Sequence, residues 1–194
     1  MPSLPRPALF IFFGLIASGK STLGQAFADR NDVRYYNSDV IRKELAGQLA
    51  QNGRQAGFDQ GIYTKAFTEK TYSALLTRAE ADLSAGISVA LDASYQDPTE
   101  RLRVRKLAEQ LALPIYFVLC LCPEDEMKRR MEMRALDPKA VSDGRWEIYL
   151  QQKERYRSPD ELPPGSLITI NTDDSVANLL ATLERLLAET GATH

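Results

Sequence analysis

Gly14-Leu15-Ile16-Ala17-Ser18-Gly19-Lys20-Ser21-Thr22 is the stretch that decides the fold. It matches the pattern G-x-x-x-x-G-K-[ST] at every fixed position. The apolar run Leu9 to Phe13 precedes it, and apolar residues recur at helical spacing over 23–27, so the stretch joins a strand to a helix. Glycines let backbone N–H groups approach an anion at the positive end of such a helix. The stretch therefore predicts a phosphate-binding loop.

Each polar residue of this loop has a predicted role. Lys20 is expected to bind the β- and γ-phosphates of a nucleotide and to act in catalysis, and the Ser21 hydroxyl is expected to ligate Mg²⁺. The other nucleotide-binding candidates in the loop are Gly14, Ala17, Ser18, Gly19 and Thr22. A plain glycine turn with a solvated lysine is the competing interpretation, which the flanking strand and helix disfavour.

The rest of the chain alternates short apolar runs with helical patterns, which is typical of a parallel sheet covered by helices on both faces. The predicted strands are Leu9 to Phe13, Val33 to Asn37, Ser88 to Leu91, Ile115 to Leu121 and Leu167 to Ile170. No linker or repeat divides residues 1–194, so we expect one α/β domain. Two stretches, Leu49 to Gly61 and Ala135 to Ser142, are predicted to be surface loops on either side of a cleft.

Composition excludes several classes of function. The single histidine is His194, the last residue, which argues against Ser-His-Asp hydrolysis and His-ligated zinc. A net charge of -2 gives no global positive field for nucleic acid. Cys120 and Cys122 are one residue apart in an apolar run, a spacing that predicts free buried thiols in a reducing compartment.

The N-terminal residues suggest no membrane partner. Residues 1–6 are proline-rich and lack the features of a signal peptide, and the apolar run Ala8 to Phe13 is shorter than the ~20 residues that a membrane-spanning helix needs. We therefore expect a cytoplasmic protein, while the oligomeric state stays undetermined.

Motifs that the sequence lacks argue against two classes of nucleotide-binding protein. The GTPase strings D-x-x-G and N-K-x-D do not occur, and no glutamate follows Asp92, where motor-type ATPases usually carry one. The absence of these motifs favours a protein that transfers a phosphoryl group to a bound acceptor.

The second predicted strand leads into candidate acceptor residues. Asp39 should lie at the carboxyl end of the sheet, where a carboxylate can accept the proton of an attacking hydroxyl. Ser38 or Asp39 could instead cap the following helix, and the two roles are compatible. Arg42 shares a helical face with Asp39 and could hold an anionic or polar acceptor, although a solvated surface arginine is the alternative.

The third predicted strand ends near two further candidates. Asp92 could hold the water shell of Mg²⁺ or orient acceptor groups, with a capping or buried-turn role as the alternative. Tyr95 is expected to line the substrate pocket, although a half-buried tyrosine explains it as well.

Two arginines are predicted to form a catalytic lid. Arg130 and Arg134 are four residues apart on a helix that runs into the second predicted loop, so both can project from one face. On a closing lid they would neutralise charge on the transferred phosphoryl group and exclude water. A solvated basic face after Glu124 to Glu126 is the alternative.

These pieces together resemble the polynucleotide-kinase-like group of P-loop kinases, which includes phage polynucleotide 5'-kinase, zeta toxins and chloramphenicol phosphotransferase. The chain is especially similar to stand-alone bacterial predicted kinases that match the kinase half of proteins fused to an aminoglycoside-phosphotransferase-like domain. The matching pieces are Gly14 to Thr22, Asn37 to Arg42, Leu91 to Tyr95, Cys122 with Arg130 and Arg134, and Val141 to Asp143.

The resemblance implies an adenylate-kinase-like three-layer sandwich with a five-stranded parallel sheet in the order 2-3-1-4-5 and a helical lid. It implies ATP as donor, Asp39 as base, Arg42 on the acceptor and Thr172, with Asn171, against adenine. The acceptor-side segment would span about 38–62 and the lid about 128–145.

The leading hypothesis is an ATP- and Mg²⁺-dependent kinase that phosphorylates a hydroxyl of a small metabolite or antibiotic. A polynucleotide 5'-OH kinase is the nearest alternative, so a nucleic-acid acceptor stays open but is not favoured. The third hypothesis is a non-catalytic ATP-binding switch or a toxin-like module.

Overall fold

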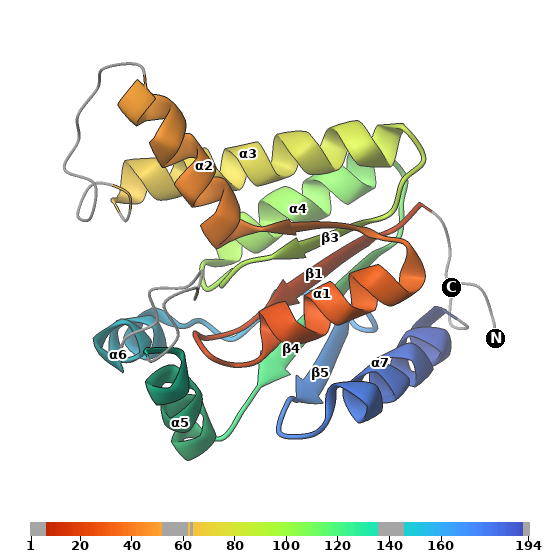
Figure 1. Ribbon diagram of the computed structural model, residues 1–194. Helices are drawn as coiled ribbons and strands as arrows, with labels where there is room; N and C mark the ends of the chain where they lie inside the picture. Colours follow the sequence, from red (N-terminus) through yellow and green to blue (C-terminus); the bar gives the residue numbers. More distant parts are fainter. Residues whose placement is uncertain (1–6, 52–61, 63, 136–145, 192–194) are drawn as a thin grey trace.

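The computed structural model describes residues 7–51, 62, 64–135 and 146–191, and Figure 1 shows their arrangement. A parallel sheet of five strands forms the centre, with helices on both faces. The strands are β1 (Leu9–Phe13), β2 (Arg34–Asn37), β3 (Val89–Asp92), β4 (Ile115–Leu121) and β5 (Leu167–Asn171). Their order across the sheet is β2-β3-β1-β4-β5, which confirms the predicted order.

The helices are α1 (Lys20–Asn31), α2 (Ser38–Gln51), α3 (Lys65–Ser84), α4 (Pro98–Gln110), α5 (Glu124–Ala135), α6 (Trp146–Arg155) and α7 (Val176–Gly191). Buried side chains of α3 and α4 pack on one face of the sheet, and those of α1 and α7 on the other. In Figure 1, α2 lies beside α3, while α5 and α6 lie together beyond the carboxyl ends of the strands. The result is the predicted three-layer sandwich.

The central strand β1 supplies both layers of the core. Leu9, Ile11 and Phe13 point toward α3 and α4, while Phe10 and Phe12 point toward α1 and α7, as the period of two in a strand requires. All five residues are buried, which explains a continuous apolar run where a half-exposed strand would alternate.

The register of the strands brings three loops to one edge of the sheet. Phe12 pairs with Asp92 of β3 and Val118 of β4, and Asn37 of β2 also pairs with Asp92. The carboxyl ends of β1, β2 and β3 therefore lie side by side, which is where ligands bind in open parallel sheets.

The boundaries of the elements differ from the prediction at a few places. Val33 is not part of β2, because its N–H donates to the carbonyl of Ala28 in the turn that ends α1. β3 begins at Val89 and includes Asp92, and β5 extends to Asn171. Helix α2 continues to Gln51, into the stretch that was expected to be a loop. Residues 52–61 and 136–145 lie outside the described residues, so the acceptor-side and lid segments are described only in part.

Two further predictions concern membrane-spanning helices and the state of the two cysteines. Among the helices that the structure describes, none combines the length and the apolar character needed to cross a bilayer. Cys120 is a buried free thiol, as predicted, whereas the free thiol Cys122 is partly exposed. Burial raises the pKa of Cys120 to about 12, so this thiol is unreactive at neutral pH.

Candidate active site

The phosphate loop follows β1 and ends in the first turn of α1. Gly14 and Gly19 have φ angles of 142° and 81°, which favour glycine. A Cβ atom on Gly14 would lie 2.4 Å from the carbonyl oxygen of Cys120, and one on Gly19 would lie 2.9 Å from Cβ of Thr172. Neither position has room for a side chain, so both glycines of the motif are required by the surrounding backbone and side chains.

Thr172 fixes the loop from the opposite side. Its hydroxyl donates to the carbonyl of Ser18 at 2.6 Å, and its backbone N–H donates to the carbonyl of Leu121 at 2.8 Å. The residue is 2% exposed. The first residue after β5 therefore holds the phosphate loop against the end of β4.

The polar groups of the loop fit a phosphate. The Lys20 ammonium donates to the carbonyl of Leu15 at 3.3 Å, which holds it over the loop. The Ser18 hydroxyl oxygen is buried and has no hydrogen-bond partner among the described residues. Buried polar atoms are normally paired, so a phosphate oxygen would complete this loop.

Asp92 at the end of β3 is held by two residues that the sequence analysis did not single out. Tyr35 donates its hydroxyl to Asp92 Oδ2 at 2.5 Å, and Asn37 donates its side-chain amide to the same oxygen at 2.7 Å. Asp92 is fully buried. The pKa of Tyr35 is raised by burial and by the neighbouring carboxylate, so the tyrosine stays a neutral donor.

The same group fits a magnesium ion. Asp92 Oδ1 is buried without a hydrogen-bond partner in the described part of the chain, and the Tyr35 hydroxyl interacts with the side chain of Ser21 as well as with Asp92. Ser21 and Asp92 therefore both lie near the Tyr35 hydroxyl. Mg²⁺ usually keeps several waters and binds substrate phosphates in addition to one or two protein ligands.

Asp39 lies in the first turn of α2 and is not needed as its cap. The Asn37 side-chain oxygen accepts from the backbone N–H groups of Asp39 and Val40, at 2.9 and 3.1 Å. The expected capping by Ser38 or Asp39 is therefore replaced by Asn37. Burial raises the pKa of the Asp39 carboxyl; Lys20 opposes this shift, and Asp92 adds to it. A carboxylate whose pKa is shifted upward is better suited to accept a proton.

A cavity of about 430 Å³ brings together two of the four predicted acceptor residues, Asp39 and Arg42, whereas Asp92 and Tyr95 are not among its lining residues. Lys20, Asp39 and Arg42 all line it, and Ser94 and Gln96 after β3 form another part of its wall. Helix α6 contributes Ile148, Gln151, Gln152 and Arg155, and helix α3 contributes Thr68 and Tyr72. These α6 residues were not predicted, and the apolar spacing of Trp146, Tyr149 and Leu150 is the signal that could have placed a helix there.

Helix α6 is attached directly to the phosphate loop. The Gln152 side chain accepts from the backbone N–H of Ile16 at 2.8 Å. Ile16 and Ala17 also pack with Tyr149 of α6 and with Met127 and Met131 of α5. The loop that binds phosphate is therefore also part of the wall of the acceptor cavity.

Arg42 is more buried than a surface arginine would be. It is 7% exposed and donates to the carbonyl of Ile62 at 2.5 Å and to the hydroxyl of Thr68 at 3.3 Å. These bonds fix the guanidinium beside the cavity. Its contact with an acceptor stays a prediction.

The structure does not bring Tyr95 to the cavity wall, contrary to our expectation. Tyr95 is 1% exposed, and its ring packs edge-on against Tyr72 with 5.1 Å between centroids. Its φ of 42° turns the chain so that the side chain enters the core, while its neighbours Ser94 and Gln96 line the cavity. Arg101 stabilises this turn by donating to the Tyr95 carbonyl at 2.6 Å.

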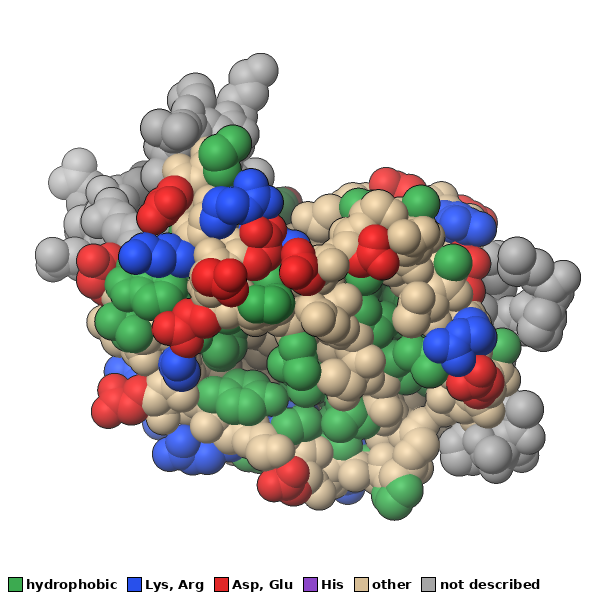
Figure 2. Space-filling model, turned by 90° about the horizontal axis from the view of Figure 1, so that it is seen from below, with side chains coloured by type: hydrophobic (Ala, Val, Ile, Leu, Met, Phe, Trp, Pro, Cys, Tyr) green, Lys and Arg blue, Asp and Glu red, His purple; other side chains and the backbone are tan. Residues whose placement is uncertain are grey.

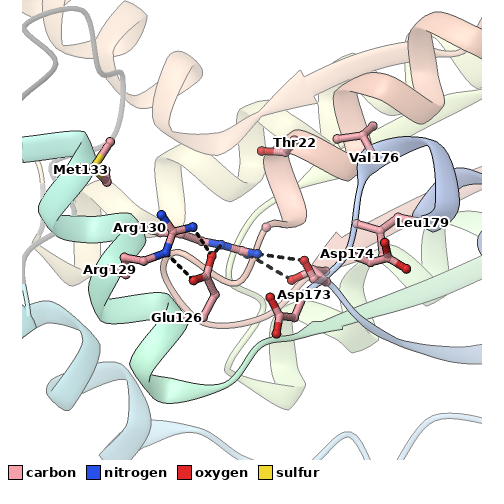
Figure 3. A pocket seen from close by; sticks show the side chains of 11 residues that line it. Thr22, Glu126, Arg129, Arg130, Met133, Asp173, Asp174, Val176 and Leu179 are labelled. Atoms are coloured by element: carbon pink, nitrogen blue, oxygen red, sulfur yellow. Dashed lines mark hydrogen bonds and ion pairs between the residues drawn. The ribbon is translucent and has the colours of Figure 1, made fainter.

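A second cavity, of about 580 Å³, lies on the other side of the phosphate loop. Figure 3 shows Arg129 and Arg130 of α5 on one wall, and Asp173 and Asp174, which follow β5, on the other. Gly19, Thr22 and Thr172 join the two walls. Its position beside the loop suits the base and ribose of a nucleotide, and a contact of Thr172 with adenine stays a prediction.

Arg130 links α5 to the nucleotide side. It pairs with Glu126 at 2.7 Å and donates to the carbonyl of Thr172 at 2.9 Å and that of Ala17 at 3.5 Å. The arginine therefore lines the second cavity, and a role in phosphoryl transfer stays a prediction. The backbone of Arg134 belongs to α5, but its side chain lies outside the described part of the structure.

Comparison with known proteins places this site in a family. The model of the family described as AAA domain matches residues 9–159. The chain belongs to this family. The match includes the loops that follow β1, β2, β3 and β4 at the carboxyl edge of the sheet, and it ends before β5.

Curated relatives of this AAA-domain protein match part of its sequence. The uncharacterized protein Rv2004c of Mycobacterium tuberculosis is 30% identical over 118 residues, which are 61% of this chain and 24% of that protein. The matched region thus spans about a quarter of the curated relative's length.

Solved structures extend the likeness to nearly the whole domain. A sugar kinase from Janibacter sp. HTCC2649 has a TM-score of 0.65 at 19% identity and covers 95% of both chains. The APS kinase CysC of Mycobacterium tuberculosis, solved with AMPPNP and APS, has a TM-score of 0.64 at 20% identity, with 95% of this chain and 99% of that chain covered. The AAA-domain protein therefore has the fold of P-loop kinases.

Proposed function

We propose that this protein is an ATP-dependent kinase that transfers the γ-phosphoryl group to a hydroxyl of a small-molecule acceptor. The observation that carries the proposal is the 430 Å³ cavity, whose wall contains both Lys20 of the phosphate loop and Asp39. A carboxylate with a raised pKa and the lysine of the phosphate loop thus line the same cavity. The likeness to kinases in fold supports the same reaction class.

Each step of the proposed transfer has a residue that can perform it. The oxygen of the acceptor hydroxyl bonds to the γ-phosphorus, and Asp39 accepts the proton of that hydroxyl. The bond between the γ-phosphorus and the β–γ bridging oxygen breaks. ADP leaves with the bridging oxygen. Lys20 binds the β- and γ-phosphates, and Ser18 and the backbone of the loop hold their oxygens. Mg²⁺, held by Ser21 and through water by Asp92, would supply further positive charge at the phosphates.

The size of the cavity favours a small molecule over a polynucleotide. A volume of about 430 Å³ lies in the range of roughly 300–1,000 Å³ that is typical of small-ligand sites. Acidic, basic and apolar side chains are interspersed on the face shown in Figure 2, which presents no continuous basic track among its coloured residues. A nucleic-acid strand would need such a track for its phosphates.

The decisive test is ATP consumption by wild type and Asp39→Asn over a panel of metabolites, antibiotics and 5'-OH oligonucleotides. The proposal expects stimulation by one small acceptor, lost in the variant while ATP affinity is retained. Stimulation only by oligonucleotides, seen as a labelled band on a gel, would establish the polynucleotide alternative. Tight ATP binding without turnover for any acceptor, unchanged in Asp39→Asn, would establish a non-catalytic switch.

Two further expectations are checked separately. A toxin-like role predicts growth arrest on expression, relieved by Asp39→Asn. A cytoplasmic location is supported by the free thiols Cys120 and Cys122, which suit a reducing compartment, and cell fractionation measures it directly.

A further inference from the structure

Among the described residues that line the acceptor cavity, positive charges outnumber negative ones. Lys20, Arg42 and Arg155 belong to this set, and the carboxylate of Asp39 is its one acidic group. Lys20 and Asp39 are engaged in the proposed transfer, and Lys20 is the strongest of the opposing charges acting on Asp39. The two arginines, Arg42 of α2 and Arg155 of α6, have no role in the proposed transfer step. The cavity thus contains a cationic part that phosphoryl transfer itself does not use.

Arg155 is the less constrained of the two arginines. It is the last residue of α6 and makes no hydrogen bond or ion pair within the described part of the chain. Arg157, two residues later, instead donates to the carbonyls of Glu154 and Tyr156. A guanidinium at the wall of a cavity presents a planar fork that matches a carboxylate or phosphate. Arg155 is therefore placed to bind an anionic group of a ligand.

Arg42 gives the wall of the same cavity a fixed, partly dehydrated charge. Its 7% exposure removes most of the water that would hydrate the guanidinium, and the bonds to Ile62 and Thr68 set its orientation. A charge in such surroundings interacts more strongly with an ion of opposite sign than an exposed charge does.

The uncharged lining suits a molecule with several hydroxyl groups. The neutral polar side chains that line the cavity are those of Ser38, Thr68, Tyr72, Ser94, Gln96, Gln151 and Gln152. The amides of Gln96 and Gln151 make no hydrogen bond to any other described residue. Amides and hydroxyls can both donate and accept, as sugar hydroxyls do.

We propose that the acceptor is a small polyhydroxylated anion, a sugar acid or a sugar phosphate, whose charged group is bound by Arg155 and Arg42 while one hydroxyl reaches Asp39. This inference rests on the proposed kinase function and specifies its substrate class. The carboxylate and the phosphate share the chemistry that an arginine pair recognises, and the cavity volume accommodates one molecule of this size.

The test measures binding and turnover with matched acceptors. Full-length protein saturated with AMPPNP is titrated calorimetrically with sugar acids of three to seven carbons, with the corresponding sugar phosphates, and with the neutral polyol of each. ATP turnover is measured with the same panel. We expect an anionic member to bind about 10- to 100-fold more tightly than its neutral counterpart, and the acid and phosphate arms to identify the preferred anion.

Arg155→Gln removes the charge, and Arg157→Gln provides a matched control on the same segment outside the cavity. The first change should reduce the preference for the anionic over the neutral acceptor about 10-fold, mainly through KM, and the control should retain the preference. The wild-type preference should also decline with added salt, because Arg155 is exposed.

The two proposals fail in different ways. Anionic acceptors that bind with Arg155-dependent preference but are not phosphorylated would leave the substrate-class inference standing and overturn the kinase. Equal or better binding of the neutral polyols, a preference untouched by Arg155→Gln, or no binding of any panel member would overturn the inference.

Discussion

Asn37 and Asp92 are register partners on neighbouring strands, and the Asn37 amide donates to Asp92 Oδ2 at 2.7 Å. The oxygen of the same amide accepts from the backbone N–H groups of Asp39 and Val40. One side chain thus connects the carboxylate proposed for the magnesium side with the helix that carries the proposed base. The spacing of the two carboxylates depends on this amide.

Replacing Asn37 should therefore affect both stability and turnover. Asn37→Ala removes the cap of α2 and should lower the free energy of unfolding by about 1 kcal/mol, measured by urea denaturation. Turnover should fall as well, because Asp92 and the start of α2 lose their connection. Asn37→Ser is the matched variant: its hydroxyl can cap the helix, so it should recover stability but not the full turnover. Full activity of Asn37→Ala would contradict the positioning role.

Asp39 should limit activity at low pH. Burial raises the pKa of this carboxyl above its ordinary value of 3.8, and the base must be unprotonated to act. We expect kcat/KM to fall as the pH drops through the raised pKa, and Asp39→Asn to reduce turnover about 100-fold or more. A pH profile whose acid limb is the same for an active Asp39 variant would rule out this assignment.

The same raised pKa makes a prediction for stability. The folded state holds the Asp39 proton more tightly than the unfolded state, so this stabilising contribution is complete below the unfolded pKa and is lost as the pH rises through the folded pKa. At neutral pH the buried charge is therefore unfavourable. Asp39→Asn should raise the Tm at pH 7 and change it little near pH 3, whereas the exposed Asp29→Asn serves as a control at both pH values.

Arg130 should matter for nucleotide affinity. Its guanidinium bonds to the carbonyls of Ala17 and Thr172, so it connects the phosphate loop with the loop after β5. Arg130→Ala should raise the KM or Kd for ATP about 10-fold, in the range expected when a charged hydrogen-bonding group is removed. Arg185→Ala on the exposed side of α7 removes the same charge from a surface pair with Glu189 and should leave the affinity unchanged. Equal effects of the two variants would contradict the role.

Arg101 should be the most costly arginine to replace. It is fully buried, pairs with Glu161 at 2.6 Å and donates to the carbonyls of Tyr95 and Gln96. Arg101→Met leaves these acceptors unpaired, and we expect a loss of roughly 3 kcal/mol in the free energy of unfolding. Arg105→Met breaks an exposed pair with Glu109 and an exposed hydrogen bond to the Glu161 carbonyl at 3.4 Å, and it should cost less than about 1 kcal/mol.

The sequence was sufficient to predict the fold because its main signals are local. The phosphate-loop motif identifies the turn between β1 and α1, and β1 and β4 are apolar throughout because a parallel sheet covered on both faces buries both sides of its strands. The order of the strands came from the family resemblance, which the fold bears out.

The contents of the acceptor side were harder to predict because they depend on contacts between distant residues. Gln152 meets the N–H of Ile16 across 136 positions, and helical spacing in α6 does not reveal what that helix packs against. Likewise, the bond between Asn37 and Asp92 requires the register of β2 on β3. Tyr95 was assigned to the cavity from its distance along the chain, whereas its positive φ sends the side chain to the core.

The hydroxyl of Thr172, bonded to the carbonyl of Ser18, has a consequence for how such a domain can change during evolution. The nucleotide-binding side of the domain consists of residues from β1, β4 and the loop after β5, which are bonded to one another. Mutations there therefore disturb several strands at once. The acceptor half takes much of its wall from one short helix, α6, which touches the phosphate loop mainly through Gln152 and Tyr149. For the proposed kinase, exchange of that helix between relatives would alter the acceptor while the phosphoryl donor stays the same, which makes α6 a natural unit for redesign.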